Sequence, residues 1–498
     1  MKIKSISLER MSQERTLRAD FVYNHHFSDL DRGKEYVSFD ELFSVVKRKF
    51  DIQELDGSFK YCQISDVDKN GEIHPVTLNF DERNLLDESY YKKIESGDII
   101  EVCEHDILVS FLLPQDVSVL GKMLRVTPDI ADVFFTSAFL CITPKIMPEI
   151  LYYALKSVFY KDLVAISRIR KGYTGYATLD SSDLRQLKFD KRTIEILRGN
   201  YEELKGRIKA REDGIAEASA SLESAESIIN RIFQKEFGFD YASFQCLKAI
   251  KTYTCASERI ADNPDLRFSA KFHRGAGRFV MEQLTGVTSK KIKHFLSEPI
   301  VLGAGISPKD YLEDSGYYYI SMAAIKSWAF DSEGASTVSK EFFDAKREKT
   351  VRKNDIIFVR SGEGTIGKAA LIDSDDIQGV FCDFTMRIRL KDYNPEFAYY
   401  YFRTGYFQYL VEIYKKGLGN NTNIFPIAMK EFPMIDIPLG EQRRIVDEIR
   451  GELEKQNKIR ARIAELRADI DALVRETVES GGVRRTVDDA LCTASQLW

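Results

Sequence analysis

Residues 106–109 read Asp-Ile-Leu-Val, and residues 355–358 read Asp-Ile-Ile-Phe, 249 positions further along the chain. Three more pairs of segments match at nearly the same distance: residues 17–23 with 266–272 at 249 positions, 121–122 with 367–368 at 246, and 170–172 with 415–417 at 245. A single match of this kind would carry no weight, but four at a nearly constant offset are typical of an internal repeat. The sequence therefore predicts two copies of one structural unit.

Both copies place the same kinds of segment in the same order. Apolar runs such as Tyr-Tyr-Tyr-Ile at 317–320 and Ile-Ile-Phe-Val at 356–359 predict a β-rich part at the start of each copy. A short helical stretch follows, at 149–155 in the first copy and at 395–401 in the second. A long polar segment rich in Glu, Lys, Arg and Ala closes each copy and predicts a long helix.

The two closing segments carry apolar residues at heptad spacing. In the first, steps of four and three residues lead through Leu197, Tyr201, Leu204, Ile208, Arg211, Ile215, Ala218, Leu222, Ala225, Ile229 and Ile232. In the second, the same rhythm links Ile459, Ile463, Leu466, Ile470 and Leu473. Because a narrow apolar stripe on a long helix must be covered, we expect the two helices to pair as an antiparallel coiled coil. The alternative is that each stripe packs only on its own globular unit.

The predicted fold class is α+β, with two β-rich globular units in tandem repeat, each followed by a long helix. The expected boundaries are 1–190 for the first unit, 191–237 for the central helix, 238–436 for the second unit, 437–479 for the C-terminal helix and 480–498 for a tail. Pro433 and Pro438 bracket the start of the last helix. Gly481 and Gly482 are expected to end it, because glycine often terminates helices.

Composition narrows the class of protein. The 498 residues are too many for one compact domain, and 72 Lys and Arg against 77 Asp and Glu give a net charge of −5. Residues 1–192 carry −4 and residues 241–436 carry +3, so any DNA contact must come from residues clustered on one face. The seven cysteines form no CxxC pair, no apolar run is long enough for a membrane span, and the start of the chain is polar. We therefore expect a cytoplasmic protein without a disulfide scaffold, membrane segment or signal peptide.

Cationic loops occupy the same position in both copies. The second copy offers Arg360, Ser361, Gly362, Thr365 and Lys368 in one loop, and Lys415, Lys416, Asn420, Asn421, Thr422 and Asn423 in another. The loop of the first copy that corresponds to the latter contains Arg168, Arg170, Lys171, Tyr173 and Thr174. Arg and Lys can neutralise phosphates, and an Asn amide can form two hydrogen bonds with adenine, although Asn-Asn-Thr-Asn is equally a turn sequence. Because the cationic loop recurs, we expect these residues to bind DNA.

The glycine-rich stretch 362–369 is similar to a phosphate-binding loop. It matches GxxxxGK[ST] except at the last position, where Ala369 lacks the hydroxyl that would hold magnesium. The residues that follow are too few to form the required helix and predict the second strand of a hairpin. The glycines are better explained by a loop that needs positive φ or a close backbone approach. A nucleotide-binding enzyme that uses 362–368 stays an alternative, as does a coiled-coil scaffold whose globular units bind proteins.

Signals for catalysis or for a metal site are weak throughout the sequence. The six histidines include no HExxH motif and no ligand pair at helical spacing, and the chain has no Gly-x-Ser-x-Gly motif. An adenine methyltransferase would need an NPPY or DPPY motif, which is missing. We therefore expect no catalytic residue and no metal ligand in this chain.

Several motifs resemble the specificity (S) subunits of type I restriction–modification enzymes. Residues 355–362 with Ile366-Gly367-Lys368 resemble that family's strand–loop–strand signature. Residues 424–445, with Pro438 and Glu441-Gln442, resemble the approach to its conserved helix, and residues 18–20 resemble its domain-opening Arg-x-Asp-Ala-x-Tyr pattern. The resemblance covers nearly the whole chain, because it also rests on the order unit, helix, unit, helix. The first copy departs from it: residues 110–114 contain no equivalent of Arg360, and residues 187–192 lack the proline and Glu-Gln.

The resemblance implies a non-catalytic subunit that reads DNA. The globular units would be target recognition domains, each reading one half of a bipartite site in double-stranded DNA. The paired helices would fix the distance between the halves. Methyltransferase (M) and restriction (R) subunits would be the partners, and S-adenosylmethionine, ATP and magnesium would bind to them rather than to this chain. The complex would methylate adenine in host DNA and cut unmodified foreign DNA.

Overall fold

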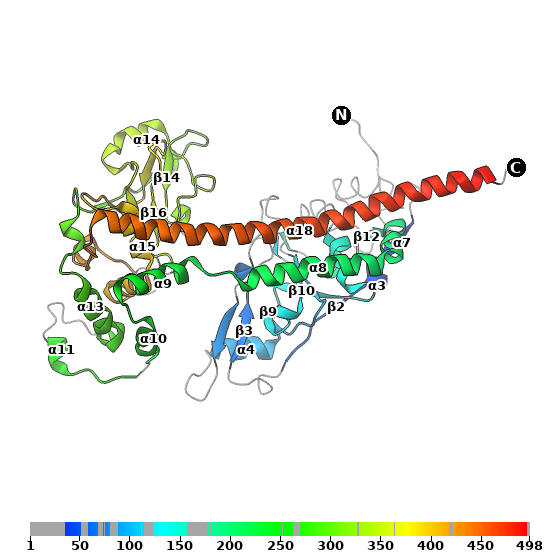
Figure 1. Ribbon diagram of the computed structural model, residues 1–498, viewed down its shortest axis with the longest axis horizontal. Coiled ribbons are helices and arrows are strands. Elements are labelled where there is room, and N and C mark those ends of the chain that lie inside the picture. Colours follow the sequence, from blue (N-terminus) through cyan, green and yellow to red (C-terminus); the bar gives the residue numbers. More distant parts are fainter. Residues whose placement is uncertain are drawn as a thin grey trace. The chain divides into compact units, whose positions relative to one another are not determined.

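The structure is a computed structural model that divides into two compact units. It describes residues 35–50, 58–67, 73, 75–79, 88–110, 112–113, 123–156, 177–178, 181–250, 252–261, 269–325, 328–362, 364–417 and 422–495. Unit 1 consists of Met1–Ala220 and Arg460–Trp498, and unit 2 consists of Ser221–Ile459. Each unit therefore combines one globular part with a portion of both helical segments (Figure 1).

The described part of unit 1 contains short strands and helices. Its strands are β1 (Tyr36–Ser38), β2 (Phe43–Val46), β3 (Ser58–Cys62), β4 (Val76–Asn79), β5 (Ile99–Ile100), β6 (Ile107–Ser110), β7 (Leu112–Leu113), β8 (Met123–Arg125), β9 (Val133–Thr136), β10 (Phe139–Pro144), β11 (Ala177–Thr178) and β12 (Lys188–Asp190). Its helices include α3 (Phe39–Leu42), α4 (Glu88–Ser96), α6 (Ser181–Leu184), α7 (Lys191–Gly199) and α8 (Tyr201–Ala220).

Unit 2 contains six short strands and more helix than unit 1 in its described residues. The strands are β13 (Val301–Leu302), β14 (Tyr318–Ile320), β15 (Ile356–Val359), β16 (Ala369–Leu371), β17 (Gly379–Phe381) and β18 (Thr385–Ile388). The helices are α9 (Ala225–Phe237), α10 (Tyr241–Ala249), α11 (Ser257–Ala261), α12 (Ala270–His273), α13 (Gly275–Val287), α14 (Lys340–Ala345), α15 (Pro395–Arg403), α16 (Gly405–Tyr414) and α17 (Pro426–Met429). The last helix, α18 (Leu439–Ser495), starts in unit 2 and ends in unit 1.

A four-stranded antiparallel sheet with the same strand order lies in each unit. Unit 1 has the order β2-β10-β6-β8, and unit 2 has the order β13-β18-β15-β16. When the four strands are numbered along the chain, both sheets read 1-4-2-3. Each unit also contains one parallel strand pair, β3 with β9 and β14 with β17. The repeated segments 106–109 and 355–358 therefore occupy the same central place in two sheets of the same topology, as an internal repeat requires.

The turn before the central strand is also repeated, hydrogen bond for hydrogen bond. In unit 1 the N–H of His105 donates to the carbonyl oxygen of Val126 at 2.8 Å, and the N–H of Val126 donates back to that of Asp106 at 2.7 Å. The N–H of Asp106 donates to the carbonyl oxygen of Cys103 at 3.0 Å. In unit 2 the N–H of Asn354 donates to the carbonyl oxygen of Ile372 at 2.7 Å, and the N–H of Ile372 donates back to that of Asp355 at 2.9 Å. The N–H of Asp355 donates to the carbonyl oxygen of Arg352 at 3.1 Å. His105 and Asn354 both have a φ of 72°, an uncommon conformation for residues other than glycine. Two turns with this detail are the structural counterpart of the sequence repeat.

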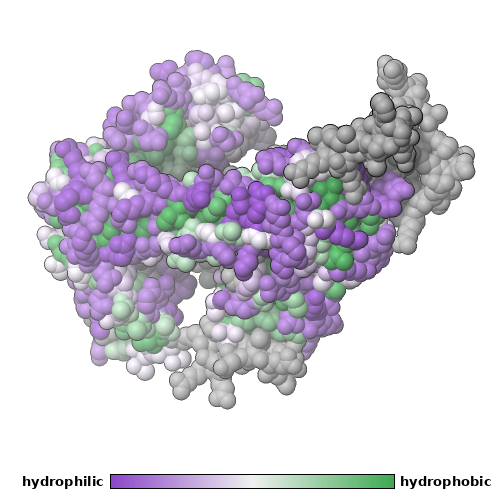
Figure 2. Space-filling model, turned by 45° about the vertical axis from the view of Figure 1, so that its right-hand side comes forward, coloured by the Kyte–Doolittle hydropathy of each residue, from purple (hydrophilic) through white to green (hydrophobic). Residues whose placement is uncertain are grey.

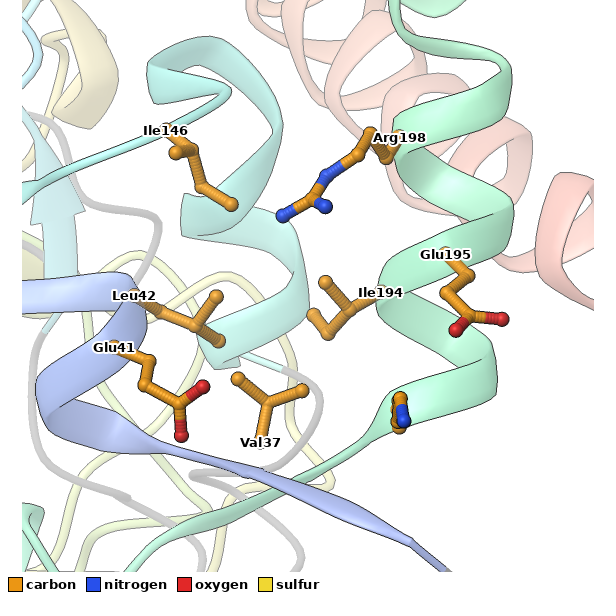
Figure 3. A pocket seen from close by; sticks show the side chains of 8 residues that line it. Val37, Glu41, Leu42, Ile146, Ile194, Glu195 and Arg198 are labelled. Atoms are coloured by element: carbon orange, nitrogen blue, oxygen red, sulfur yellow. The ribbon is translucent and has the colours of Figure 1, made fainter.

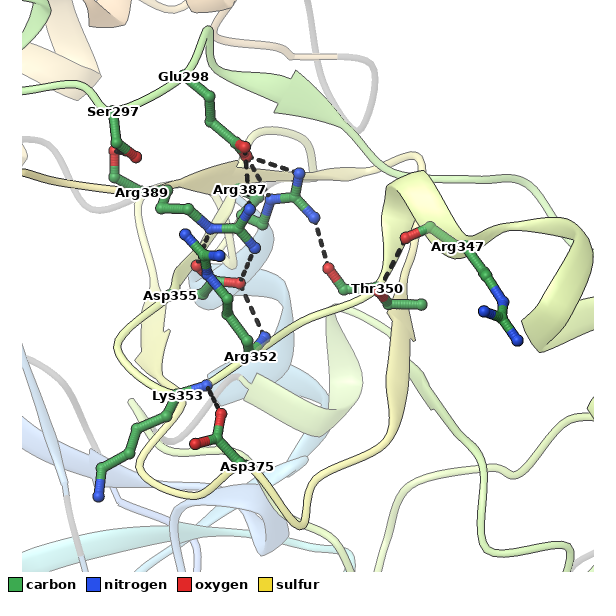
Figure 4. Close-up of polar contacts among 10 residues, drawn as sticks. All are labelled: Ser297, Glu298, Arg347, Thr350, Arg352, Lys353, Asp355, Asp375, Arg387 and Arg389. Carbon is green, nitrogen blue, oxygen red and sulfur yellow. Dashed lines mark hydrogen bonds and ion pairs between the residues drawn. The ribbon is translucent and has the colours of Figure 1, made fainter.

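A fully buried aspartate anchors each of these turns through an arginine. Arg389 donates to both carboxylate oxygens of Asp355 at 2.6 and 2.8 Å, and Arg48 likewise binds Asp106 (Figure 4 shows the cluster of unit 2). Arg389 also binds Glu298 at 2.9 Å. Burial raises the pKa of Glu298, but hydrogen bonds from Arg387 and Arg389 outweigh it and hold the pKa below its ordinary value. Since a buried charge is tolerated only when it is paired, these ion pairs fix the residue that directly precedes the central strand.

Unit 2 does not start with its sheet. The sequence analysis predicted a β-rich part at the start of each copy, yet four helices, α10 to α13, precede β13. Phe272, which belongs to the domain-opening match at 266–272, lies in α12, and residues 266–268 lie outside the described residues. The helices form because their apolar residues, such as Phe244, Val280 and Leu284, pack into the main core of the unit.

The first helical segment is interrupted twice. The sequence analysis predicted one helix over 191–237, but the structure has three, α7, α8 and α9. The side-chain amide of Asn200 donates to the carbonyl oxygen of Ile196 at 2.8 Å where α7 ends. The hydroxyl of Ser224 accepts a hydrogen bond from the backbone of Ser227 at 3.1 Å where α9 begins. Asn and Ser side chains compete with helical backbone bonds, so the heptad pattern continues while the helix restarts.

Within unit 1, the helices α7 and α8 run antiparallel to the last part of α18 (Figure 1). Gly214 in α8 faces Leu466, whereas Ile196 in α7 faces Gly481, so rising residue numbers meet falling ones. Leu204 and Ile208 share one buried cluster with Ile470, Leu473, Val474 and residues of the globular part such as Leu151 and Leu155. The apolar stripe of α8 is therefore covered both by another helix and by its own globular unit.

Within unit 2, α9 runs antiparallel to the first part of α18. Lys235 binds Glu448 at 2.8 Å, Arg231 lies 3.7 Å from Glu452, and Arg444 binds Glu236. Between α8 and α9, the backbone N–H of Glu223 donates to the side-chain oxygen of Gln456 at 2.8 Å. Gln456 is buried, and a buried polar side chain of this kind fixes the register of neighbouring helices.

The prediction that Gly481 and Gly482 end the last helix is wrong. The helix α18 continues to Ser495 and has 57 residues. A Cβ atom at position 481 would lie 2.7 Å from Cγ2 of Ile196, so the glycine allows α7 to pack closely against α18. The glycine at this position therefore allows the two helices to approach closely and does not end α18.

One face of the molecule is mostly hydrophilic. On the face shown in Figure 2, polar residues predominate and hydrophobic residues form small scattered groups. Among the described residues, none of the helices combines the length and the apolar character that crossing a membrane would require.

Candidate nucleic-acid interface

Two loops that the sequence analysis predicted to contact DNA lie side by side in unit 2. The first follows β15 and spans 360–368, and the second follows α16 and spans 415–423. Ser361 and Lys416 each form an isolated β-bridge with Asn423, and the N–H of Gly362 donates to the carbonyl of Thr422 at 3.3 Å. Asn423 therefore joins the two loops. Asn420 and Asn421 lie outside the described residues.

Arg360 is held in one orientation at this junction. Its Nε donates to the carbonyl oxygen of Asp383 at 2.9 Å, and its Nη1 donates to Oδ1 of Asn423 at 2.9 Å. Its guanidinium lies 5.9 Å from the ring centroid of Phe425, a cation–π distance. Nη2 has no hydrogen bond or ion pair with any described residue. A guanidinium that is fixed on one side and unoccupied on the other is prepared to bind a phosphate or a base edge.

Ser361, Gly362 and Thr365 shape the first loop from within. The hydroxyl of the buried Ser361 donates to Thr422, and that of Thr365 donates back to Ser361 at 3.2 Å. Gly362, Gly364 and Gly367 have φ values of 92°, 78° and 94°, as expected for glycines that a loop needs for positive φ. Ser361 and Thr365 therefore hold the loop together rather than offer free hydroxyl groups to a ligand.

Lys368 lies against an aromatic residue and a second cation. Its Nζ is 4.6 Å from the ring centroid of Trp328, and the guanidinium carbon of Arg403 is 5.1 Å from the same centroid. Arg403 is also 3.6 Å from Glu226. Burial lowers the pKa of Lys368, the charge of Glu226 opposes this effect, and the charge of Arg403 adds to it. Lys368 is thus a half-buried cation beside one carboxylate and another positive charge.

The two lysines of the second loop differ in environment. Lys415 binds Glu412 at 2.8 Å, and its side chain is only 12% exposed. Lys416 is exposed, as is Gly417, whose φ is 110°. Of this pair, Lys416 has the position that a contact with a phosphate requires, whereas Lys415 stabilises the end of α16.

Three residues that the sequence analysis missed surround Arg360. Asp383 and Phe384 form the turn between β17 and β18, and Phe425 precedes α17. Both phenylalanines are exposed, Phe384 by 46% and Phe425 by 42%. A turn between two short strands is visible in the sequence, but its contact with Arg360 joins residues more than twenty positions apart, and no local pattern encodes it.

The corresponding loop of the first copy cannot be placed. Arg168, Arg170, Lys171, Tyr173 and Thr174 all lie outside the described residues. Their role in DNA binding stays a prediction.

The glycine-rich stretch of unit 2 leads into a strand. β16 starts at Ala369 and pairs antiparallel with β15, as the sequence analysis predicted for a hairpin. A phosphate-binding loop would lead into a helix whose N-terminus faces the phosphates. In the part of the chain that the structure describes, no three His, Cys, Asp or Glu residues gather closely enough to hold a metal ion.

Unit 1 has an open cleft of about 400 Å³ beside the start of α7 (Figure 3). Four apolar and four charged residues line it: Val37, Leu42, Ile146 and Ile194, and Glu41, Lys191, Glu195 and Arg198. Glu41 accepts hydrogen bonds from the backbone and hydroxyl of Ser38 at 3.0 and 2.7 Å. Lys191 binds Glu35 at 2.6 Å. These two charges serve the start of α3 and of α7, and so they do not converge on a ligand as polar groups of a small-molecule site do.

Comparison with known proteins gives matches among solved structures. No protein-family model and no curated protein matches the sequence. One similar chain belongs to a type I R-M system whose complex assembly and conformational transition were analysed; it has 14% identity and a TM-score of 0.37, with 90% of this chain and 97% of that chain covered.

Two further similar chains are single subunits. The HsdS subunit from Thermoanaerobacter tengcongensis has 14% identity and a TM-score of 0.29, and the match covers 91% of this chain and 97% of that one. The S subunit of a type I restriction-modification system from M. genitalium has 13% identity and a TM-score of 0.38, and the match covers 90% of this chain and 97% of that one. Identities and TM-scores this low transfer no residue's role, so the function is argued from the residues of this chain.

Proposed function

We propose that this chain is the non-catalytic specificity subunit of a type I restriction–modification complex. The observation that carries the proposal is the repeated sheet, with one strand order and one buried-aspartate turn in both units. Two copies of one globular unit are suited to reading two half-sites of double-stranded DNA. Two modest contacts on one chain combine through effective concentration, provided that the link between them has the right length.

In unit 2, Arg360 and Lys416 are the proposed contacts with DNA, and Lys368 adds positive charge at the end of the first loop. Arg360 is oriented by Asn423 and keeps Nη2 unoccupied, and Lys416 is exposed. Cations on one surface attract the phosphate backbone even though the whole unit carries little net charge. Ser361, Thr365 and Thr422 would support the loops from within. By the repeat, residues 168–174 would serve the other half-site.

The helical segments are the proposed spacer. In both units, residues of the first segment meet residues of α18 in antiparallel order. In our proposal they form an antiparallel coiled coil that acts as a ruler between the two target recognition domains. Methyltransferase subunits would dock to this chain and, with restriction subunits, would bind S-adenosylmethionine, ATP and magnesium. The complex would work in the cytoplasm.

An insertion tests the ruler directly. One heptad is added after Gly214 in α8 and one before Leu466 in α18, since these two residues face each other. At 1.5 Å per residue the addition is about 10 Å, or roughly three base pairs. Adenine methylation is then mapped in a host that expresses the chain with its methyltransferase. The expected result is a spacer longer by about three base pairs between unchanged half-sequences.

The control carries the heptad in α8 only, which breaks the pairing and should abolish methylation. An unchanged spacer in the double insertion would refute the ruler. If the unaltered chain has no sequence-selective DNA affinity even with a methyltransferase, the coiled-coil scaffold that binds proteins becomes the better interpretation.

A further inference from the structure

The turn at Cys382–Thr385 is held by hydrogen bonds to its backbone carbonyl groups. The carbonyl of Cys382 accepts from the N–H and the hydroxyl of Thr385 at 2.9 and 2.7 Å. The carbonyls of Asp383 and Phe384 accept from Nε and from the backbone N–H of Arg360 at 2.9 and 3.0 Å. The carbonyls of Cys382, Asp383 and Phe384 therefore all have partners, and these bonds hold the turn in place.

The chain behind this turn fits closely. A Cβ atom at Gly303 would lie 2.1 Å from the carbonyl oxygens of Phe381 and Cys382. The N–H of Ala304 donates to Phe381 at 2.9 Å, and that of Gly303 donates to Thr385 at 3.2 Å. The turn is thus supported from behind and cannot collapse.

The side chains of Asp383 and Phe384, at the tip of the turn, differ from its backbone. The ring of Phe384 is 46% exposed. The carboxylate of Asp383 has no hydrogen bond or ion pair with any described residue. A Cβ atom placed on the exposed Gly305 would lie 3.7 Å from Oδ2 of Asp383. The backbone of the turn therefore holds one half-buried carboxylate and one exposed aromatic ring at the tip.

Two other turn aspartates of unit 2 use their carboxylates locally. Asp331 accepts from the N–H of Gly334 at 3.0 Å, and Asp310 accepts from the N–H of Ser307 at 3.3 Å. Such bonds are the usual reason for aspartate in a turn. Asp383 makes no bond of this kind with any described residue, so its carboxylate does not close the turn.

Its position beside Arg360 gives the carboxylate a selective effect. Arg360 and Lys416 attract DNA phosphates, whereas Asp383 repels them. The repulsion is compensated only where a base offers an amino group, since a carboxylate accepts well from N4 of cytosine and can accept from N6 of adenine in the major groove. A carboxylate beside these cations therefore penalises the wrong sequence.

We propose that the turn at Cys382–Thr385 reads bases in the major groove of one half-site. Asp383 accepts a hydrogen bond from the exocyclic amino group of a base, and Phe384 makes apolar contact with a neighbouring base, such as the methyl group of thymine. Arg360 holds the turn and donates to the same stretch of DNA. This inference rests on the proposed function and adds the element that determines specificity in unit 2.

The test uses the full chain together with its methyltransferase. Methylated sites are mapped for the unaltered chain, for Asp383→Ala and for Phe384→Ala. Asp383→Ala should relax one base position in one half-site, with a loss of discrimination of about 5- to 150-fold there. Phe384→Ala should weaken methylation of the same half-site. The other half-sequence and the spacer should stay as they are, and thermal unfolding should be unchanged, because the backbone bonds of the turn do not involve either side chain.

Two matched variants serve as controls. Glu341→Ala removes an exposed carboxylate from α14, and Leu312→Ala removes an apolar side chain that is 52% exposed. Both should leave the methylated sequence unaltered. If Asp383→Ala keeps every base position as strict as before, the inference is wrong although the proposed function stands. If the unaltered chain directs no methylation to a bipartite site, the proposed function itself fails.

Discussion

Replacing Gly303 with alanine should destabilise unit 2, whereas the same change at Gly305 should not. The new Cβ at position 303 would lie 2.1 Å from two carbonyl oxygens, and that at position 305 would lie 3.7 Å from Oδ2 of Asp383. The second distance is an ordinary contact. The first requires the turn to move by more than about 1 Å, because a carbon and an oxygen in contact are normally separated by over 3 Å.

The magnitude follows from what this movement breaks. It would lengthen the bonds from Ala304 to Phe381, at 2.9 Å, and from Gly303 to Thr385, at 3.2 Å. Two backbone hydrogen bonds at about 1 kcal/mol each, plus about 1–3 kcal/mol for overpacking, lower the free energy of unfolding by about 3–5 kcal/mol. Gly305→Ala should change it by less than about 0.5 kcal/mol. The effect of Gly→Ala on the unfolded chain is similar for both variants and cancels in the comparison.

Urea denaturation followed by tryptophan fluorescence measures the difference. Trp328 is buried in unit 2 and reports on its unfolding. A Trp498→Phe background leaves it as the single indole, since the chain has two tryptophans. Equal stability of the two glycine variants would contradict the close packing behind the turn.

Three further predictions concern charge. Hydrogen bonds from Lys291, with the larger effect, and from Lys293 lower the pKa of Glu431 to about 2. Because the pKa of Glu431 is lower in the folded than in the unfolded chain, these bonds stabilise the fold above pH 4 to 5, and the stabilisation is lost as the pH falls toward 2. The melting temperature of Glu431→Gln should therefore lie slightly below that of the unaltered chain at pH 6, by less than the equivalent of about 1 kcal/mol for an exposed pair, and should match it near pH 2. NMR of ¹³C-methylated lysines should show a lowered pKa for Lys368 that falls further in Glu226→Gln, since Glu226 raises it; an unchanged value would place Glu226 too far away to act. Arg360→Ala should weaken binding to every duplex sequence and reduce the slope of log K against log salt by about one, whereas Arg347→Ala, which removes a guanidinium that is 75% exposed, should not; equal slopes would remove Arg360 from the interface.

The sequence was most informative where structure depends on local patterns. The strand at 356–359, the second hairpin strand after Lys368 and the helix from Pro395 all form as their apolar patterns indicate. The positive φ of Gly362 and Gly367 follows from the same loop. The repeat offset of 249 also leads directly to the paired aspartates, because both copies need the same buried anchor.

The sequence was least informative where a residue depends on a distant partner. The contact of Asn423 with Ser361, 62 positions away, joins the two loops and decides which of their residues stay accessible. The close approach at Gly481 of α18 involves Ile196, nearly three hundred positions away. Local propensity cannot encode such contacts, because tertiary packing overrides it.

The division of α18 between the two units has a consequence for recombination. Unit 1 takes residues from both ends of the chain, with boundaries at 220/221 and 459/460. A single crossover that exchanged only residues 1–220 for those of a homologue would replace Leu204 and Ile208 but keep Ile470 and Leu473, which pack with them in one buried cluster. A hybrid that keeps a native core must therefore inherit its first 220 residues and its last 39 from the same parent.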